Sequence, residues 1–417
     1  MNGGEINYYT HSSKTKCVFV DNKDLPLICI DIWCKAGSSF EDVEKKGTAH
    51  FLEHMIFKGS NKIMPGEFDH RIESLGGSSN ASTGYDDAHY YVLIPPINFK
   101  ESLALLTNIV LSPEINIKEF DVEKNVVIDE IKQQNDQPDE KLFNFFLNRV
   151  WISDNYSKSI LGSEKNIEIL EKHDLERFHI NQYNQENICI AIAGNLSQDT
   201  YKIFHESNLP YKKSFNPLEI KKSKRKLKAI ARTGREEIDF ENIEFSRIFM
   251  AWSIPSLKNQ KITIGLEILA SILSEGRNSR LIKSLKEEKN LIESIYVDVN
   301  AGELGGLFII EACCDDKNLK YVEVKINEII NEVSGKNKIT LSEIRKAINI
   351  VKSNYVFNLE TSTQLSSFFG NDLLWGRKNS LENIDIYLKH WNNLNNFKEI
   401  INFLSKDKFT LIASSGK

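Results

Sequence analysis

The sequence predicts an α+β protein made of two domains that arose by duplication. The chain has 417 residues, which exceeds the roughly 100–200 residues of an ordinary single domain. Hydrophobic residues make up 41% and charged residues 27% of the chain, as in globular proteins that fold around a core. Apolar strand-like segments and helical segments also follow each other in the same order in both halves. We therefore expect two homologous α/β-sandwich-like domains.

The repeated order starts with an apolar strand, continues through a loop into an apolar helix, and later reaches a charged amphipathic helix that opens with Leu-Ser. The expected segments are strand 28–33 with helices 48–57 and 119–134 in the first half, and strand 246–252 with helices 262–273 and 341–355 in the second.

A linker between the halves is expected at residues 208–233. This stretch holds two prolines and the basic run 221–226. Like charges repel and keep a segment extended, which favours a solvated connector over a phosphate-binding or acidic-partner patch. The predicted domains are therefore residues 1–207 and 234–417.

Charge and hydropathy exclude two classes of partner. The net charge is −5 and the pI about 6.1, so no overall basic field indicates nucleic-acid binding. No apolar run approaches the roughly 18–20 residues of a membrane span. The chain starts without a secretory signal pattern, and its six cysteines form no Cys-x-x-Cys pair. We expect a cytoplasmic protein with buried free thiols and no nucleic-acid or membrane partner.

The segment His50-Phe51-Leu52-Glu53-His54 carries the sharpest chemical pattern. On the predicted helix, His50, Glu53 and His54 share one face within an arc of roughly 100°. Two imidazoles one turn apart can bind one zinc ion, and the carboxylate between them can accept a proton from an activated water. This is the reversed order of the His-Glu-x-x-His motif. The alternative is the polar side of an amphipathic helix whose core side is formed by Leu52, Met55 and Ile56.

A third ligand has to come from another segment. Glu123 and Glu130 lie seven residues apart on one face of the helix predicted at 119–134. One of them can reach a metal while the other acts behind the ligands or on the substrate. Carboxylates on a charged helix are otherwise ordinary solvated residues.

The stretch 76–92 combines small residues with an alternating strand pattern. A peptide can add to an exposed strand edge through main-chain hydrogen bonds, and this mode of binding tolerates many peptide sequences. The alternative is a Gly-rich turn before a hairpin. We expect His89 on this strand to be packed or on the surface rather than to bind metal.

Taken together, these motifs resemble the pitrilysin-type zinc peptidases, which include insulysin, pitrilysin and the mitochondrial processing peptidase. The likeness rests on His-x-x-Glu-His followed by Val-Val-x-x-Glu-Ile around Glu130. It extends over most of residues 5–200 and continues more weakly to the end. The further matching segments are Phe51–Gly59, Leu75–Gly77, Asn80–Thr83, His89–Val92 and Ala193–Asn195.

The resemblance implies a role for each matching residue. It makes His50, His54 and Glu130 the ligands of one zinc ion, Glu53 the general base and Glu123 a further active-site carboxylate. It also implies that Asn80, Ala81 and Ser82 line the substrate. The length matches the short, processing-peptidase-like members, whose two homologous domains form half of a clamshell, so that dimerisation is implied.

We therefore expect a zinc metalloendopeptidase, or the zinc-bearing subunit of one, that hydrolyses peptides or unfolded segments. One alternative is a catalytically inactive structural or assembly subunit of the same family. Another is a metal-binding protein that is no peptidase. Both alternatives remain open at the level of the sequence.

One departure from the family pattern concerns the partner. Active members use an Arg and a Tyr seven residues apart in the second half to hold substrate. Aligned without gaps, these positions are Lys286 and Glu293, and a three-residue shift brings in Tyr296. Lysine lacks the planar fork of arginine, and glutamate places a negative charge where a hydroxyl is expected. We predict a heterodimer whose related subunit supplies the Arg–Tyr pair, with a homodimer as the alternative.

Overall fold

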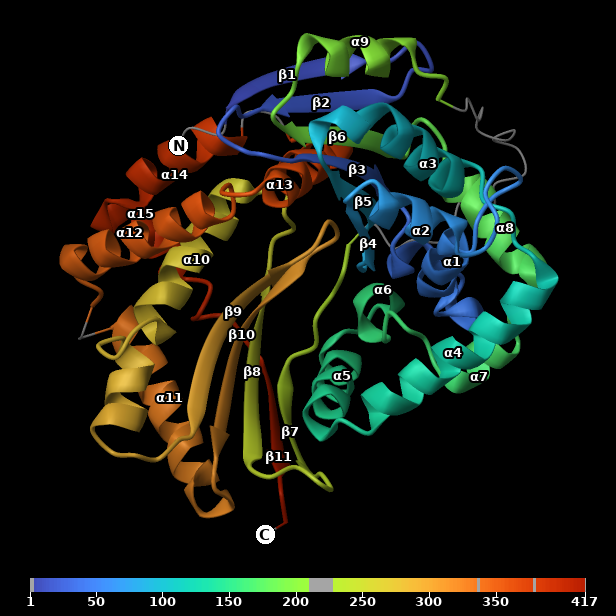
Figure 1. Ribbon diagram of the computed structural model, residues 1–417. Helices are drawn as coiled ribbons and strands as arrows, with labels where there is room; N and C mark the ends of the chain where they lie inside the picture. The colour runs from blue at the N-terminus through green and yellow to red at the C-terminus, as the bar shows by residue number, and fades with distance from the viewer. Residues whose placement is uncertain (1–3, 210–227, 336–337, 378–379, 417) are drawn as a thin grey trace. The chain divides into compact units, whose positions relative to one another are not determined.

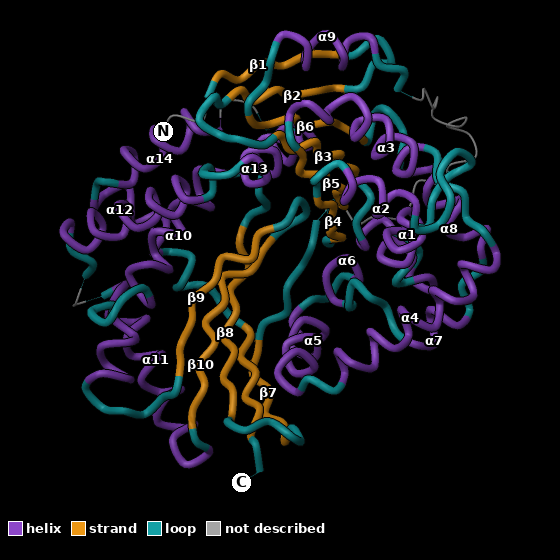
Figure 2. Tube along the Cα trace, in the orientation of Figure 1, coloured by secondary structure: helices purple, strands orange, loops and turns teal. Residues whose placement is uncertain are grey.

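The computed structural model describes residues 4–209, 228–335, 338–377 and 380–416. The chain forms two compact units, each with one β-sheet and helices packed against it (Figure 1, Figure 2). Unit 1 comprises Met1–Gln133, Ser159–Arg225 and Val356–Lys378, and unit 2 comprises Gln134–Lys158, Lys226–Tyr355 and Asn379–Lys417. Each unit thus takes helices from the other half of the chain, whereas the predicted boundaries treat each domain as one stretch. Residues 210–227 of the predicted linker lie outside the described residues.

The sheet of unit 1 has six strands in the order β1-β2-β6-β3-β5-β4. Neighbouring strands are antiparallel except for the parallel pair β2 and β6. All residues of β3 are buried, which confirms the predicted apolar strand and places it inside the sheet. The strands are β1 (Glu5–Thr10), β2 (Lys16–Asp21), β3 (Ile28–Cys34), β4 (Ser78–Thr83), β5 (Ala88–Ile94) and β6 (Ile188–Gly194).

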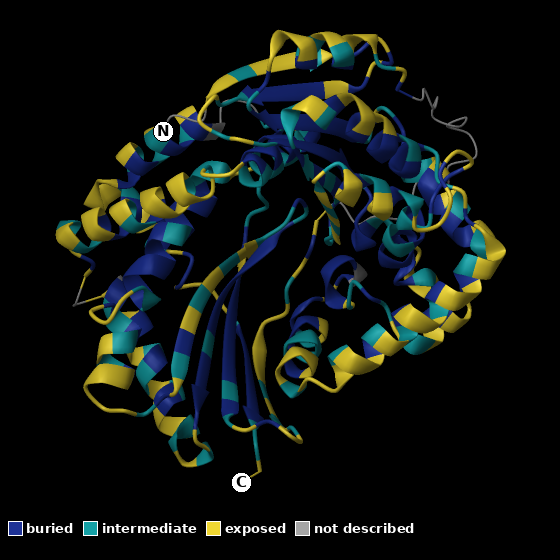
Figure 3. Cartoon of the chain, viewed as in Figure 1, coloured by how far each residue is buried: buried dark blue, intermediate teal, exposed yellow. Residues whose placement is uncertain are grey.

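Helices cover both faces of this sheet (Figure 3). Side chains of a strand alternate between its two faces, so the fully buried strand β3 packs against helices on both. Ile30 and Ile32 of β3 join the main core with α1 and α3. Asp31 and Trp33 point to the other face, which α13 covers. The helices of unit 1 are α1 (Thr48–Phe57), α2 (Glu67–Ser74), α3 (Phe99–Leu111), α4 (Ile117–Asn135), α7 (Glu164–Glu168), α8 (Lys172–Gln182), α9 (Gln198–Glu206) and α13 (Ser362–Trp375), with short 3-10 turns η1 (Ser38–Phe40), η2 (Val43–Lys45) and η3 (Pro96–Asn98).

Unit 2 has a five-stranded sheet in the order β7-β11-β8-β10-β9. Its core includes a stacked pair of rings, Phe146 and Phe249, with centroids 4.7 Å apart. The strands are β7 (Gly234–Asp239), β8 (Ser246–Ile254), β9 (Ser294–Ala301), β10 (Gly306–Cys314) and β11 (Phe409–Ser414). The helices are α5 (Pro138–Val150), α6 (Asp154–Ser157), α10 (Gln260–Ser274), η4 (Ile282–Glu287), η5 (Asp316–Asn318), α11 (Leu319–Ser334), α12 (Leu341–Phe357), α14 (Ser380–Trp391) and α15 (Leu394–Ile401).

The two units share one topology, as the repeated sequence pattern predicts. In each, a buried strand (β3 or β8) leads through helices to an antiparallel pair (β4–β5 or β9–β10) and a further helix (α3 or α11). The strand orders correspond from β2 to β4 and from β7 to β9, including one parallel pair in each sheet. The predicted pair of homologous α+β domains is therefore confirmed.

Two further expectations concern location. All six cysteines are buried and unpaired, as predicted. Among the helices in the described part of the chain, none is both long and apolar enough to cross a bilayer.

Candidate metal centre

Helix α1 presents the predicted histidine pair. It spans Thr48–Phe57 and ends before Gly59, as the sequence predicts. Its core side is formed by Leu52, Met55 and Ile56, each fully buried, and it packs against α3, α8 and β4. The opposite side carries His50, Glu53 and His54. The rings of the two histidines lie edge to face with centroids 4.7 Å apart.

The start of α1 is held by a carboxylate from the preceding loop. Gly47 adopts a left-handed conformation (φ 95°), and a Cβ there would lie 2.5 Å from the carbonyl oxygen of Leu161, so only glycine fits. Glu41 accepts hydrogen bonds from the backbone N–H groups of Ala49 (2.7 Å) and Gly47 (3.2 Å). Negative charge at a helix N-terminus is favourable, and Glu41 thus fixes the turn that precedes His50.

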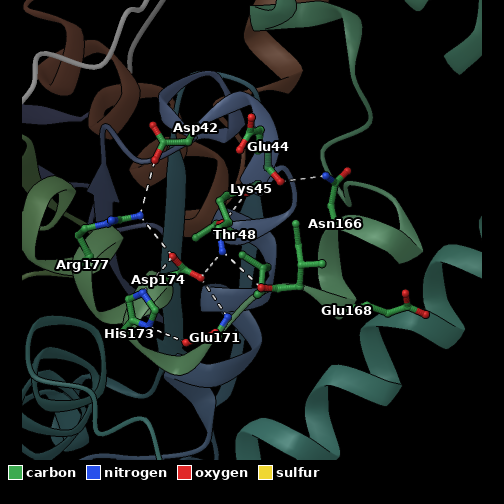
Figure 4. Close-up of polar contacts among 12 residues, drawn as sticks. Asp42, Glu44, Lys45, Thr48, Asn166, Glu168, Glu171, His173, Asp174 and Arg177 are labelled. Atoms are coloured by element: carbon green, nitrogen blue, oxygen red, sulfur yellow. Dashed lines mark hydrogen bonds and ion pairs between the residues drawn. The ribbon is translucent and has the colours of Figure 1, made fainter.

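A polar network ties this loop to α7 and α8 (Figure 4). Lys45 donates to the buried carboxylate of Asp174 at 2.8 Å, and Arg177 also contacts Asp174. On the other side, Asn166 donates to the backbone carbonyl of Glu44 at 3.1 Å. The network therefore anchors the residues just before α1.

Helix α4 brings two carboxylates to the histidines, and its predicted amphipathic character is confirmed. Glu130 Oε1 lies 3.7 Å from His50 Nε2, and Glu130 Oε2 lies 3.5 Å from His54 Nε2. Two helical turns earlier in α4, Glu123 Oε1 lies 3.0 Å from His54 Nδ1. Glu123 and Glu130 thus approach the same imidazole from opposite edges.

The donor set formed by His50, His54 and Glu130 fits zinc. One ligand atom of each residue lies within 4.8 Å of the other two. Ligands about 2.0–2.1 Å from a tetrahedral zinc lie about 3.3–3.4 Å apart, close to the separations of 3.5 and 3.7 Å here. Burial, and then the neighbouring His54, lower the pKa of His50 to about 4, so this imidazole is neutral at physiological pH. Neutral imidazole is the form that binds zinc.

Glu123 contacts His54 and is not part of the donor set formed by His50, His54 and Glu130. Its second oxygen lies 2.7 Å from Lys58 Nζ. Burial acts to raise the pKa of Glu123, but the hydrogen bonds from Lys58 and His54 outweigh it and lower the pKa below its ordinary value. In the neutral tautomer of His54 that an ionised Glu123 favours, the proton is on Nδ1 and the lone pair of Nε2 faces Glu130.

Glu53 lies beside the donor set, with its side chain directed at strand β4. Thr83 Oγ1 donates a hydrogen bond to Glu53 Oε2. Burial raises the pKa of Glu53, against the lowering effects of the Thr83 hydrogen bond and of His54 and His89. A partly desolvated carboxylate with a raised pKa is suited to taking up and releasing a proton.

The predicted substrate residues Asn80, Ala81 and Ser82 lie on β4, which is the edge strand of the sheet. Asn80 and Ser82 are exposed on one face, while Ala81 packs against the core on the other. The Ala81 N–H donates to Asn80 Oδ1 at 2.8 Å. Among the described residues, no strand pairs with the outer edge of β4.

Three supporting residues escaped sequence reasoning. Thr83 is the next core-facing strand position after Ala81, so the period-2 pattern could have indicated its direction. Lys58 lies one turn after His54 on the same helix face, a position that carries a signal only once Glu123 is placed. The contact of Glu41 with α1 could not be predicted, because the sequence does not define the path of the loop that carries Glu41.

The positions expected for an Arg–Tyr pair lie in unit 2. Lys286 of η4 donates from Nζ to the backbone carbonyl of Glu293. Tyr296, which the shifted alignment brings in, lies on edge strand β9 with 65% of its surface exposed.

Profiles of two known protein domains match this chain. The profile of the insulinase family (peptidase family M16) matches residues 18–164, and that of the peptidase M16 inactive domain matches residues 170–351. The chain belongs to peptidase family M16. Family relatives described as zinc proteases include YmxG of Bacillus subtilis, uncharacterized, which is 25% identical over 99% of both chains. The zinc protease PqqE of Helicobacter pylori is 27% identical over 88% of this chain and 82% of its own.

Solved structures show the same M16 fold. A protease from Helicobacter pylori superposes with a TM-score of 0.86 at 23% identity, covering 99% of both chains. A putative M16-like peptidase from Alicyclobacillus acidocaldarius gives a TM-score of 0.83 at 16% identity, covering 99% of this chain and 98% of the other. At these identities the likeness concerns the fold.

Proposed function

We propose that this chain is a zinc metalloendopeptidase, or the zinc-bearing subunit of one, that hydrolyses peptides or unfolded segments. The observation that carries the proposal is the convergence of His50 Nε2, His54 Nε2 and a Glu130 oxygen, with Glu53 beside them on the same helix. Three protein ligands leave a fourth position open, as in catalytic rather than structural zinc sites. One zinc ion per chain follows from one such cluster among the described residues.

Each residue of the site has a separate role in the proposed reaction. His50, His54 and Glu130 hold the metal, and bound zinc supplies Lewis-acid activation of water and of the scissile carbonyl. Glu53 accepts the proton of the attacking water and passes it to the leaving amine. Thr83 holds the Glu53 carboxylate in place, and Glu123 holds His54. Both are therefore positioning residues.

Substrate is proposed to bind as an extra strand along β4. The outer edge of this strand offers main-chain donors and acceptors beside Asn80, Ala81 and Ser82. In strand addition the main-chain groups of the peptide form the hydrogen bonds, so the bound segment has to be extended and therefore unfolded. This binding mode would place the peptide close to Glu53, because Glu53 accepts a hydrogen bond from Thr83 of the same strand.

We further propose that the functional unit is a heterodimer with a related chain that supplies an Arg–Tyr pair, with a homodimer as the alternative. The support is that Lys286 is engaged with a backbone carbonyl and lacks the fork of arginine. The six buried, unpaired thiols support a reducing compartment, which we propose to be the cytoplasm.

An inactive structural subunit is the second candidate, since the second half matches the profile named inactive domain. That match covers residues 170–351 and leaves the cluster on α1 and α4 outside it. Zinc analysis of the purified protein separates the candidates: about one zinc per chain supports the enzyme, and no zinc supports the structural subunit.

The proton-transfer role is tested by Glu53→Gln. We expect this variant to bind zinc as the wild type does, because Glu53 is no ligand, and to lose at least about 100-fold in turnover of quenched-fluorescent peptides. Undiminished turnover by the zinc-loaded variant would refute the role of Glu53.

A further inference from the structure

A second carboxylate–histidine pair lies on the other face of the unit 1 sheet. His89 of β5 and Asp31 of β3 approach each other with His89 Nδ1 at 3.1 Å from Asp31 Oδ1 and 3.3 Å from Oδ2. Only 1% of the Asp31 side chain is exposed, and Ser366 of α13 lies 3.5 Å from its Oδ2. No step proposed above uses this pair.

The surroundings fix the orientation of the His89 ring. The ring stacks on Trp33 with centroids 4.1 Å apart and an interplanar angle of 13°, and it lies nearly parallel to Tyr91 at 5.9 Å. Nδ1 is taken by Asp31. The remaining edge carries Nε2, which makes no hydrogen bond to any described residue, and 17% of the side chain is exposed. A rigidly held ring therefore presents one unpaired nitrogen to solvent.

This nitrogen is a hydrogen-bond donor when the ring is protonated and an acceptor when the ring is neutral. Asp31 accepts the proton on Nδ1, so protonation of the ring places the second proton on Nε2. Burial acts to lower the pKa of His89, but the hydrogen bond and charge of Asp31, with the charges of Asp87 and Glu53, raise it above the ordinary value. A protonated ring that is already paired with one carboxylate has one N–H left for an external acceptor.

The position of His89 places that donor next to the strand proposed to bind substrate. In the β4–β5 ladder His89 lies directly opposite Ser82, and both point to the same face. A peptide added to the outer edge of β4 lies two strand spacings from β5, about 10 Å. Ser82 is small and exposed, so a long side chain of the peptide can pass over it and meet the His89 ring.

We infer that His89, oriented by Asp31 and Trp33, is a specificity-determining residue that recognises one substrate side chain carrying a carboxylate or amide oxygen. This inference deepens the proposed function and rests on it. The recognised side chain belongs to the peptide residue beside Ser82 on the bound strand. A lysine or arginine at this position has no acceptor for Nε2–H and is disfavoured by the imidazolium, and leucine leaves the donor unpaired.

Binding measurements test the inference without any need for turnover. The zinc-loaded Glu53→Gln protein is titrated with peptides that carry Glu, Gln, Leu or Lys at each position in turn. We expect one position at which Glu and Gln peptides bind about tenfold more tightly than Leu and Lys peptides, as for one good hydrogen bond. A preference for both Glu and Gln indicates an acceptor oxygen as the recognised group, whereas a preference for Glu alone indicates its charge.

The variant His89→Phe keeps an aromatic ring for Trp33 and removes the donor. It is expected to bind all four peptides equally, at the level of the wild-type Leu peptide. Asp31→Asn keeps the shape and is expected to reduce the preference. The matched control is His173→Phe on the surface of α8, with 62% of the His173 side chain exposed, which should leave the preference unchanged. Thermal unfolding and zinc content confirm that each variant is folded.

Two results would overturn the inference: peptides that bind without preference at any position, or a preference that persists in folded His89→Phe. Failure of the proposed function looks different. In that case the protein with Glu53 intact binds zinc and peptides but cleaves none of them, while the preference and its loss in His89→Phe remain measurable.

Discussion

Glu123 accepts a hydrogen bond from His54 Nδ1 at 3.0 Å, and the opposite nitrogen of the same ring, Nε2, faces Glu130. A single imidazole thus connects two carboxylates of one helix, seven residues apart. The carboxylate of Glu123 sets which nitrogen of the ring carries the proton, and the carboxylate of Glu130 would share a bound metal ion with the other nitrogen.

The Glu123→Gln substitution should weaken zinc binding without abolishing it. Glutamine can present its amide nitrogen to His54 Nδ1 and no longer balances the charge of Lys58. Loss of such an outer partner typically costs about 10–100-fold in metal affinity. Competition with a chromophoric chelator measures the zinc Kd. An unchanged Kd would show that Glu123 does not orient His54.

The Glu130→Gln substitution should have a larger effect, because it replaces a proposed direct ligand with a neutral and weaker one. We expect the variant to lose zinc during dialysis that leaves the wild type loaded, and peptidase activity to fall with the zinc content. The neighbouring Asp129→Asn variant is the control, since 75% of the Asp129 side chain is exposed. Equal zinc retention in both variants would remove Glu130 from the ligand set.

We predict that the free energy of unfolding depends on pH because of Glu41, the carboxylate that contacts the start of α1. Burial raises the pKa of Glu41 to about 7, against the lowering effects of Lys46 and of the Ala49 and Gly47 N–H groups. Between about pH 4.5 and 7 the folded state keeps a proton that the unfolded state releases. The free energy of unfolding therefore falls as the pH rises through this window, by up to about 3 kcal/mol from this group.

The measurement is urea unfolding of the metal-free protein at pH 5 and pH 7.5. The Glu41→Gln variant should show a smaller loss of stability between the two pH values than the wild type. Glu44→Gln, in the same loop but exposed, should behave as the wild type does. Identical pH slopes for all three proteins would contradict the raised pKa of Glu41.

The partner prediction is tested by mixing two chains. The purified zinc-loaded protein should have low peptidase activity alone and gain at least about tenfold when its closest paralogue with an Arg–Tyr pair is added. Size-exclusion chromatography with light scattering should show a complex of one copy of each. Full activity of the chain alone, unchanged by the paralogue, would favour the homodimer.

The parts of the fold that follow from local pattern were predictable. The limits of α1 were correct because its turn residues and its apolar side agree with each other, and β3 was found because a fully buried strand reads as a continuous apolar run. The approach of Glu130 to the histidines came from the family resemblance, since nothing local indicates where α4 packs. The hydrogen bond from Thr83 to Glu53 depends on which helix packs against β4, and the contact of Asp31 with His89 depends on which strands are neighbours. Sequence spacing alone determines neither.

Helix α13 has a consequence for any attempt to divide the protein. It comes from the last quarter of the chain, yet it packs on β3 and β6 of the sheet in unit 1, the unit that holds the candidate metal centre. Its Gly370 lies so close to Trp33 that a Cβ would come within 2.4 Å of the indole, and Cys189 and Leu374 complete an apolar cluster there. The first 207 residues expressed alone would expose this apolar surface and the buried Asp31. They are therefore no autonomous folding unit, and a chain severed between its halves can regain its structure only if the two fragments associate.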